Sequence, residues 1–286
     1  MPSLKELSKQ LDDTYGGAEA LRVIRKIAKE PTAPRIKTLI EHGLGHHTCN
    51  TAEYASLYLA RMGGKAMRLV ASYGLTHPKK LVAEAAIDAI GGSGDARLLP
   101  HLMRMADPEN WKVKRAIKKL RTTAGASVEE HVKRLKDNSL LQNCWGSIAS
   151  LERDGSPEAV RALLEHGVTS GIELTMDESF NSLLRMDRKL VKREMLEFGL
   201  NHRNENVARN SASVLGSIGG NDVADALAKR YMSTEKYELR WGCVDALGHI
   251  ATNRAIKHLN ELKTASSPYW HKDIDKALAK AAKRRE

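Results

Sequence analysis

The feature that most constrains this chain is the regular spacing of its helix breaks. The breaks end at Gly64, Gly92, Gly125, Gly155, Gly220 and Asn253. The intervals are 28, 33, 30, 65 and 33 residues, and a break without glycine at 185–187 would divide the longest one. Glycine readily adopts the left-handed conformation that ends a helix. The spacing therefore predicts short helices that repeat with a period of about 30 residues.

The segments between the breaks have helical periodicity, and signals for strands are nearly absent. In VKRAIKKL, apolar residues recur at the spacing i, i+3, i+4, i+7 and form one stripe: Val113, Ala116, Ile117 and Leu120. A pair of such helices cannot bury its apolar faces alone, so pairs stack and share a core. We expect an all-α, right-handed solenoid of about seven to nine antiparallel helical hairpins, forming a single domain over residues 1–286.

The composition limits the compartment and the partners. There is no run of ~20 apolar residues to cross a membrane, and the N-terminus MPSLKELSKQ lacks the apolar core of a signal peptide. Three cysteines, far apart, are typical of a reducing compartment. We therefore expect a cytoplasmic monomer without contact to a membrane.

The charge is segregated along the chain. The formal net charge is +11, which favours nucleic acid or an acidic protein surface as a partner. Residues 111–136 contain nine Lys or Arg and two Glu, a net charge of +7, whereas residues 137–184 contain two Arg and eight acids, a net charge of −6. One part of the surface should thus be strongly positive.

Three short sequence phrases share the same order of apolar residues, glycine and a new helix start, and they indicate a family. They are DAIGGSGDARLLPHL (88–102), VLGSIGGNDVADAL (214–227) and DALGHIATNRAIKHL (245–259). They resemble HEAT and HEAT-like repeats, whose second helix ends in an Ala/Leu-Gly-x-Ile-Gly phrase before the next helix begins. The resemblance covers residues 65–264. It implies that residues 1–64 are atypical N-terminal capping repeats and that residues 265–286 are a C-terminal capping helix.

The helix predicted in NWKVKRAIKKLR is the first candidate binding site. With its apolar stripe inward, Trp111 points outward and is flanked by six cations. In HEAT-like arrays the second helix of each hairpin usually lines the concave face, so this helix would offer cations to phosphates and an indole to a base. The alternative is a solvated helix. We assign nucleic-acid binding to Trp111, Lys112, Lys114, Arg115, Lys118 and Lys119, and to Arg209 and Trp241 at the corresponding positions of later helices.

The phrase WGCVD gives a second, different candidate. Trp241 and Asp245 lie one helical turn apart. The pair resembles the active site of the alkylpurine DNA glycosylases built from HEAT-like repeats, in which an aromatic residue holds the damaged nucleotide and an Asp supports the developing charge. If that resemblance were functional, Asp245 and Trp241 would be the catalytic residues. Asp before Ala-Leu-Gly is also ordinary HEAT composition, and it sits later in this chain than in that family.

A cluster of metal-capable residues occurs in HGLGHHTC, with His42, His46, His47 and Cys49. Gly43 and Gly45 should interrupt any helix here, and no second ligand pair follows at a zinc-finger spacing. We interpret this stretch as a loop between two hairpins. The HEAT-like deoxyhypusine hydroxylases hold iron with His-Glu dipeptides, whereas this chain has the reverse order, as in Glu41-His42. We therefore expect no metal and no cofactor.

Together these observations favour a non-catalytic protein that binds the nucleic-acid backbone, with DNA as the expected partner. The cation-rich C-terminus LAKAAKRRE would be either a second phosphate contact or a match to the helix dipole. Two alternatives stay open. One is a protein-interaction scaffold in which the acidic residues 137–184 meet a basic partner, and the other is the DNA glycosylase.

Overall fold

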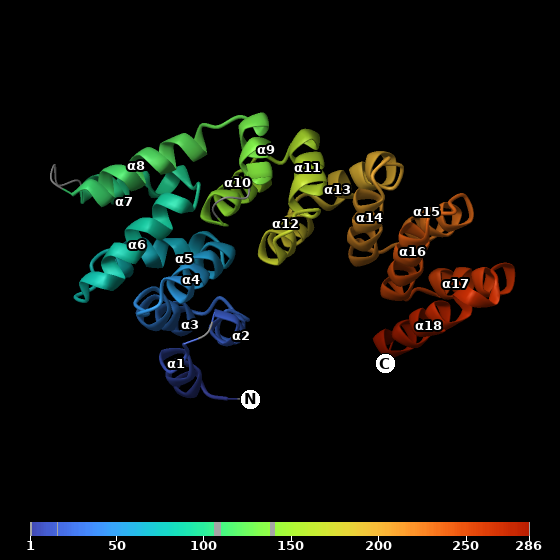
Figure 1. Cartoon of the computed structure of the whole chain (residues 1–286), viewed down its shortest axis with the longest axis horizontal. Coiled ribbons are helices and arrows are strands. Elements are labelled where there is room, and N and C mark those ends of the chain that lie inside the picture. Colours follow the sequence, from blue (N-terminus) through green and yellow to red (C-terminus); the bar gives the residue numbers. More distant parts are fainter. Residues whose placement is uncertain (1, 16, 106–109, 138–140, 286) are drawn as a thin grey trace. The chain divides into compact units, whose positions relative to one another are not determined.

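The computed structural model describes residues 2–15, 17–105, 110–137 and 141–285. These residues form 18 α-helices and no strand (Figure 1), so the predicted all-α solenoid class is confirmed. The chain divides into two compact units, Met1–Ser150 and Leu151–Glu286. In the described part of the chain, no helix is both long enough and apolar enough to cross a membrane.

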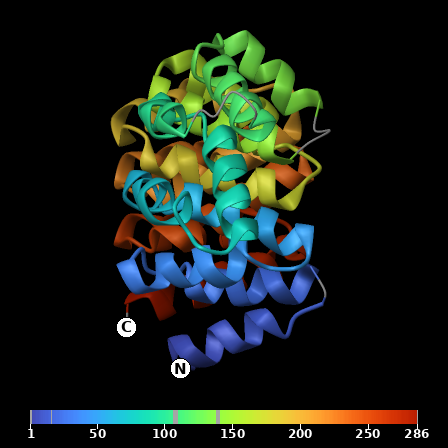
Figure 2. The same ribbon diagram turned by 90° about the vertical axis from the view of Figure 1, so that its left-hand side faces the viewer.

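The helices of the first unit pair into antiparallel hairpins. Figure 2 shows the successive hairpins from blue to green. The first helices of the hairpins are α1 (Leu4–Asp12), α3 (Ala33–Thr38), α5 (Gly64–Leu69), α7 (Leu99–Arg104) and α9 (Val128–Asp137). The second helices are α2 (Gly17–Ile27), α4 (Cys49–Arg61), α6 (Lys80–Gly92), α8 (Trp111–Ala124) and α10 (Leu141–Asp154), of which the last continues past the boundary between the units. Because α2 contacts α4, α4 contacts α6 and α6 contacts α8, these four second helices form one layer.

The second unit is built in the same way. Its first helices are α11 (Pro157–Ala162), α13 (Arg188–Glu194), α15 (Asn221–Met232) and α17 (Asn253–Ala265). Its second helices are α12 (Glu173–Arg185), α14 (Glu205–Ile218), α16 (Tyr237–Ile250) and α18 (His271–Arg285), which follow one another in a layer (Figure 1). The break expected at 185–187 lies between α12 and α13. Nine hairpins are formed within the described residues, at the upper limit of the predicted number.

Four of the first helices end in a wider, π-helical turn, and each of these turns carries a glycine. The turns are η1 (Leu39–Leu44), η2 (Val70–Gly74), η4 (Leu163–Gly167) and η5 (Met195–Gly199). Each glycine faces an Ala or Ser twelve residues later on the second helix: Gly43 and Ala55, Gly74 and Ala86, Gly167 and Ser179, Gly199 and Ser211. A Cβ atom on Gly43 would lie 2.5 Å from that of Ala55. These glycines are therefore required for close packing within a hairpin.

A second set of glycines packs neighbouring hairpins together. Gly91, Gly216 and Gly248 come from the three repeated phrases, and each lies against an alanine of the next second helix. A Cβ atom on Gly216 would lie 2.9 Å from the Cα atom of Ala246, and one on Gly248 would lie 2.8 Å from the carbonyl oxygen of Ala277. Since interiors are close-packed, such contacts leave no space for a larger residue. The glycine of the three phrases thus recurs because it allows adjacent helices to approach.

Ion pairs between successive repeats use many of the charged residues. The partners are separated by about one repeat, as in Arg161–Glu194 (2.8 Å), Lys192–Asp222 (2.6 Å), Arg209–Glu238 (3.1 Å) and Arg254–Asp225 (2.6 Å). Arg185 joins Glu152 and Glu178, each at 2.6 Å. A positive residue in this chain is therefore a candidate for ligand binding only where no such pair holds it.

Candidate functional site

Helix α8 is rotated about its axis as the sequence predicted, with most of its apolar stripe inward. The side chain of Asn110 caps its start by accepting a hydrogen bond from the backbone N–H of Val113 (3.2 Å). Val113, Ala116 and Leu120 are buried, which fixes the rotation of the helix about its axis. Trp111 is 61% exposed on the opposite side. The outward direction predicted for this indole is thereby confirmed.

The cations of α8 differ in how they are held. Lys112 forms an ion pair with Glu84 of α6 at 2.6 Å, so it already has a role in packing the two helices. Lys114, Arg115 and Lys118 are exposed, and none of them forms an ion pair with another described residue. Lys119 is half-buried. Burial and the neighbouring Arg115 lower its pKa, against the attraction of Asp88 and Glu53.

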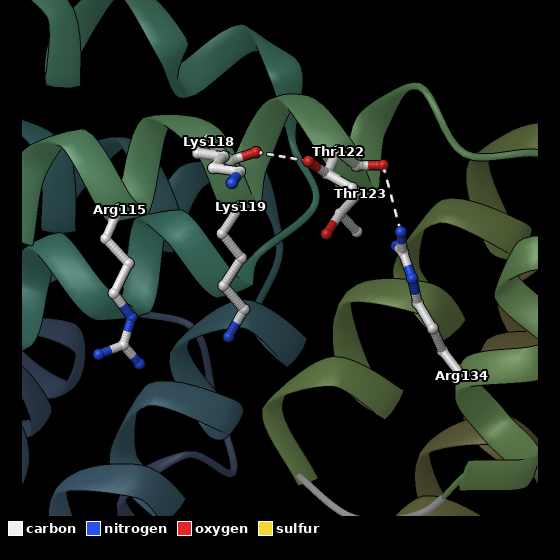
Figure 3. A pocket seen from close by; sticks show the side chains of 6 residues that line it. All are labelled: Arg115, Lys118, Lys119, Thr122, Thr123 and Arg134. Carbon is white, nitrogen blue, oxygen red and sulfur yellow. Dashed lines mark hydrogen bonds between the residues drawn. The ribbon is translucent and has the colours of Figure 1, made fainter.

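Part of α8 lines a pocket of about 330 Å³ (Figure 3). Arg115, Lys119 and Thr123 are four residues apart, and their side chains extend to the same side of the helix. The lining residues are Arg115, Lys118, Lys119, Thr122 and Thr123 from α8, with Arg134 from α9. The Arg134 guanidinium donates a hydrogen bond to the carbonyl oxygen of Thr122 at 3.4 Å. Four cations and two hydroxyl groups therefore line one hollow, and none of the described lining residues carries a carboxylate.

Arg134, Thr122 and Thr123 were not assigned to a site from the sequence. Residues 115, 119 and 123 are spaced to lie on one helical face, so this spacing could have assigned Thr123 to the same site as Arg115 and Lys119. Arg134 lies on the following helix, and its distance from Thr122 depends on how the two helices pack. No pattern along the chain could have given that contact.

A second pocket, of about 350 Å³, lies beside the second-helix layer where α4, α6 and α8 meet. It brings together Glu53, Glu84, Asp88, His46, His47, Cys49 and Lys112, with apolar residues around them. Burial raises the pKa of Glu53, although Lys119 opposes the shift. Among the described residues, no three His, Cys, Asp or Glu side chains are arranged to hold a metal ion. Three of the residues that line this second pocket, Glu53, Glu84 and Asp88, were not assigned to a site from the sequence.

The HGLGHHTC stretch is not the loop between two hairpins that we expected. Helix α3 continues as the π-helical turn through Leu44, and the stretch then joins α3 to α4 within a single hairpin. The interpretation of Gly43 as a helix breaker was wrong, because its lack of a side chain serves the contact with Ala55. His46 is buried, and its Nε2 lies 3.0 Å from the carbonyl oxygen of Leu11. Its Nδ1 accepts a hydrogen bond from the backbone N–H of Thr48 at 3.1 Å.

This environment predicts that His46 makes the fold sensitive to acid. Burial, followed by the nearby His47, lowers the pKa of His46 below its ordinary value of 6.5. The unfolded chain therefore takes up a proton near pH 6.5 while the folded chain does not, so stability is full above pH 6.5 and falls as the pH drops towards the folded pKa. The free energy of unfolding, measured with urea between pH 7.5 and 5, should fall less steeply for His46→Gln than for the parent. A His101→Gln control should keep the parent's slope, and equal slopes for all three proteins would contradict the assignment.

The candidate residues of the second unit lie on α14 and α16. Trp241 is 39% exposed on α16. Asp245 accepts a hydrogen bond from Lys280 of α18 at 2.8 Å and lies 3.5 Å from His249. Arg209 forms an ion pair with Glu238 at 3.1 Å and packs beside Gly242. Asp245 is therefore held in a polar network, and Arg209 is engaged in packing the two helices. The predicted binding residues are divided between the two compact units.

Two further tryptophans and the C-terminal cations have roles in packing. Trp145 and Trp270 are each 6% exposed and belong to the core. At the C-terminus, Arg284 donates to the carbonyl oxygen of His249, and Lys280 is held by Asp245. Two of the C-terminal cations thus join α18 to α16.

The fold and its packing define an α-helical repeat protein of the solenoid class. The sequence profile of HEAT repeats matches residues 194–279, which confirms the predicted HEAT-like repeats in that part of the chain. Among curated protein sequences, none matches this chain significantly.

Several solved structures have a similar succession of helices. Human deoxyhypusine hydroxylase is 16% identical, with 97% of this chain and 95% of that chain covered and a TM-score of 0.31. The complex of CpcE and CpcF of phycocyanin lyase from Nostoc sp. PCC7120 is 15% identical, with 93% and 96% covered and a TM-score of 0.38. A Kap121p mutant is 13% identical, with 97% and 37% covered and a TM-score of 0.39. Likenesses of this degree carry no information about activity or partners.

Proposed function

We propose that this protein is a non-catalytic HEAT-repeat binding protein whose helix α8 contacts the phosphate backbone of duplex DNA. The observation that carries the proposal is the group of exposed cations, Lys114, Arg115 and Lys118, which have no ion-pair partner among the described residues. Inter-repeat ion pairs hold several other cations of the chain, whereas these three lie together within two turns of one helix. Phosphates are the anions that a row of such cations would meet on DNA.

Trp111 adds a second kind of contact at the start of the same helix. Its exposed indole is available to stack on an unpaired base or to pack against a sugar. Neither contact reads a particular sequence, because phosphates carry no sequence information and every base has a π-face. The proposed binding is therefore independent of sequence and driven by charge.

The dependence of affinity on salt tests this function. Neutralising each phosphate releases condensed counterions, so three contacts should give a slope of log K against log salt of about −2.7. The measurement is fluorescence anisotropy with labelled duplex DNA between 50 and 200 mM NaCl. A protein that does not bind DNA at 50 mM NaCl would contradict the proposal.

The scaffold alternative rests on the HEAT repeats themselves, which suggest a repeat scaffold for a protein partner. It assigns the interface to the acidic residues 137–184. Several of those acids have partners inside the second unit: Glu152 and Glu178 bind Arg185, and Glu165 lies 3.1 Å from His202. The negative charge available to a basic partner is thus smaller than the sequence indicates, and this observation favours DNA binding through α8.

The glycosylase alternative requires Asp245 to be available beside a nucleotide. The ion pair with Lys280 and the contact with His249 give this carboxylate a structural role. We therefore expect no release of free base from DNA that carries 7-methylguanine or 3-methyladenine, measured in single turnover with the protein in excess. Base release that Asp245→Asn abolishes without unfolding the protein would replace our proposal with the glycosylase.

A further inference from the structure

The pocket between α8 and α9 shares Arg115 and Lys118 with the group of exposed cations, and it adds Lys119 and Arg134. Its hollow is lined by four cations and two threonines. The Nη1 group of Arg134 is buried and has no hydrogen-bond partner among the described residues. A buried N–H group without a partner is costly, and more so on a charged side chain. Arg134 lines the pocket, so a small rotation of its guanidinium would offer this group to an acceptor there and remove that cost.

The positive charges of this pocket also repel one another. Arg115 acts on the half-buried Lys119 and helps to lower its pKa. The carboxylates that attract Lys119 are Asp88 on α6 and Glu53 on α4, and both line the neighbouring pocket instead. Placing an anion among Arg115, Lys119 and Arg134 would therefore exchange repulsion for attraction.

We propose that this pocket binds a phosphate monoester, and that its natural source is a phosphorylated end of a DNA strand. This inference rests on the proposed DNA binding. A monoester carries close to two charges and three free oxygens, which suit several cations and the hydroxyl groups of Thr122 and Thr123. An internal phosphodiester has one charge and a sugar on each side, so it offers less charge and fewer free oxygens to the lining cations. Lys114 would contact the backbone next to the strand end, while Arg115 and Lys118 would serve both the backbone and the pocket.

The test compares three probes: a blunt duplex with 5′-phosphates, the same duplex with 5′-hydroxyl ends, and inorganic phosphate alone. Binding of the duplexes is measured by anisotropy and that of inorganic phosphate by calorimetry. We expect the phosphorylated duplex to bind about tenfold more tightly, the scale of one charge-assisted hydrogen-bonded contact. Inorganic phosphate should bind with measurable heat.

Arg134→Gln should remove both the tenfold preference and the binding of inorganic phosphate. Lys114→Gln is the matched control, because Lys114 is exposed on α8 but does not line the pocket. It should weaken both duplexes equally and keep the preference. Circular dichroism checks the fold, and Lys119→Met replaces Arg134→Gln if that variant unfolds.

The outcomes separate this inference from the proposed function. Equal affinity for the two duplexes together with no binding of inorganic phosphate overturns the pocket. Binding of inorganic phosphate that Arg134→Gln abolishes, in a protein with no affinity for either duplex, supports the phosphate pocket and refutes DNA as its source. A preference for 5′-phosphate that Arg134→Gln leaves intact assigns the end contact elsewhere and also overturns the proposal.

Discussion

Replacing Lys114, Arg115 and Lys118 by glutamate should weaken binding to duplex DNA by about 100-fold at low salt, because three phosphate contacts are lost and three repulsive charges are added. The dependence on salt should flatten by about one unit of slope for each lost contact. The side chains are exposed and have no ion-pair partner among the described residues, so their replacement leaves the core of the helix untouched. Anisotropy titrations at several salt concentrations measure both effects.

A control with the same change in net charge is needed, since any loss of positive charge weakens attraction to DNA over long distances. Lys5 and Lys9 are exposed on α1, and Lys29 is exposed after α2. Their replacement by glutamate alters the net charge equally but leaves α8 intact. If both triple variants bind alike, general charge drives the binding and α8 is not the site.

Gly199→Ala should destabilise the protein by about 2 kcal/mol, because the added methyl group overpacks a closed contact. A Cβ atom there would lie 2.2 Å from the Oγ and 2.8 Å from the Cβ of Ser211, which is fully buried. Helix propensity alone predicts the opposite sign, a gain of up to ~1 kcal/mol for replacing a helical glycine. Urea unfolding followed by circular dichroism decides between these effects.

Two further variants isolate the cause. A Cβ atom on Gly171 would meet no neighbouring atom within 4 Å, so Gly171→Ala should leave the free energy of unfolding nearly unchanged. Replacing Ser211 by glycine should restore the space and reduce the cost of Gly199→Ala, which a double-mutant cycle measures as a coupling. A cost that is the same with and without Ser211 would show that packing against this serine is not responsible.

The sequence alone was sufficient to predict the all-α repeat architecture and the orientation of α8 about its axis. Helical periodicity depends on neighbours three and four residues away, so the buried stripe of Val113, Ala116 and Leu120 could be read directly, and with it the exposure of Trp111. The repeat phrases likewise predicted HEAT-like repeats, which the profile match at residues 194–279 confirms. These features are local, and their signals lie within one or two turns of a helix.

The partners of the side chains were decided by the tertiary structure. Lys112 looked like its neighbouring cations in sequence, but the packing of α8 on α6 places it against Glu84. The partner of Asp245 is Lys280, which lies 35 residues later in the chain and is brought to it by the packing of α18 on α16. Gly43 was misread because glycine serves both to end a helix and to permit close approach, and only the position of Ala55 distinguishes these roles. Such contacts join residues within one hairpin or about one repeat apart. The distance between them is set by how helices stack, which a pattern within a single helix does not encode.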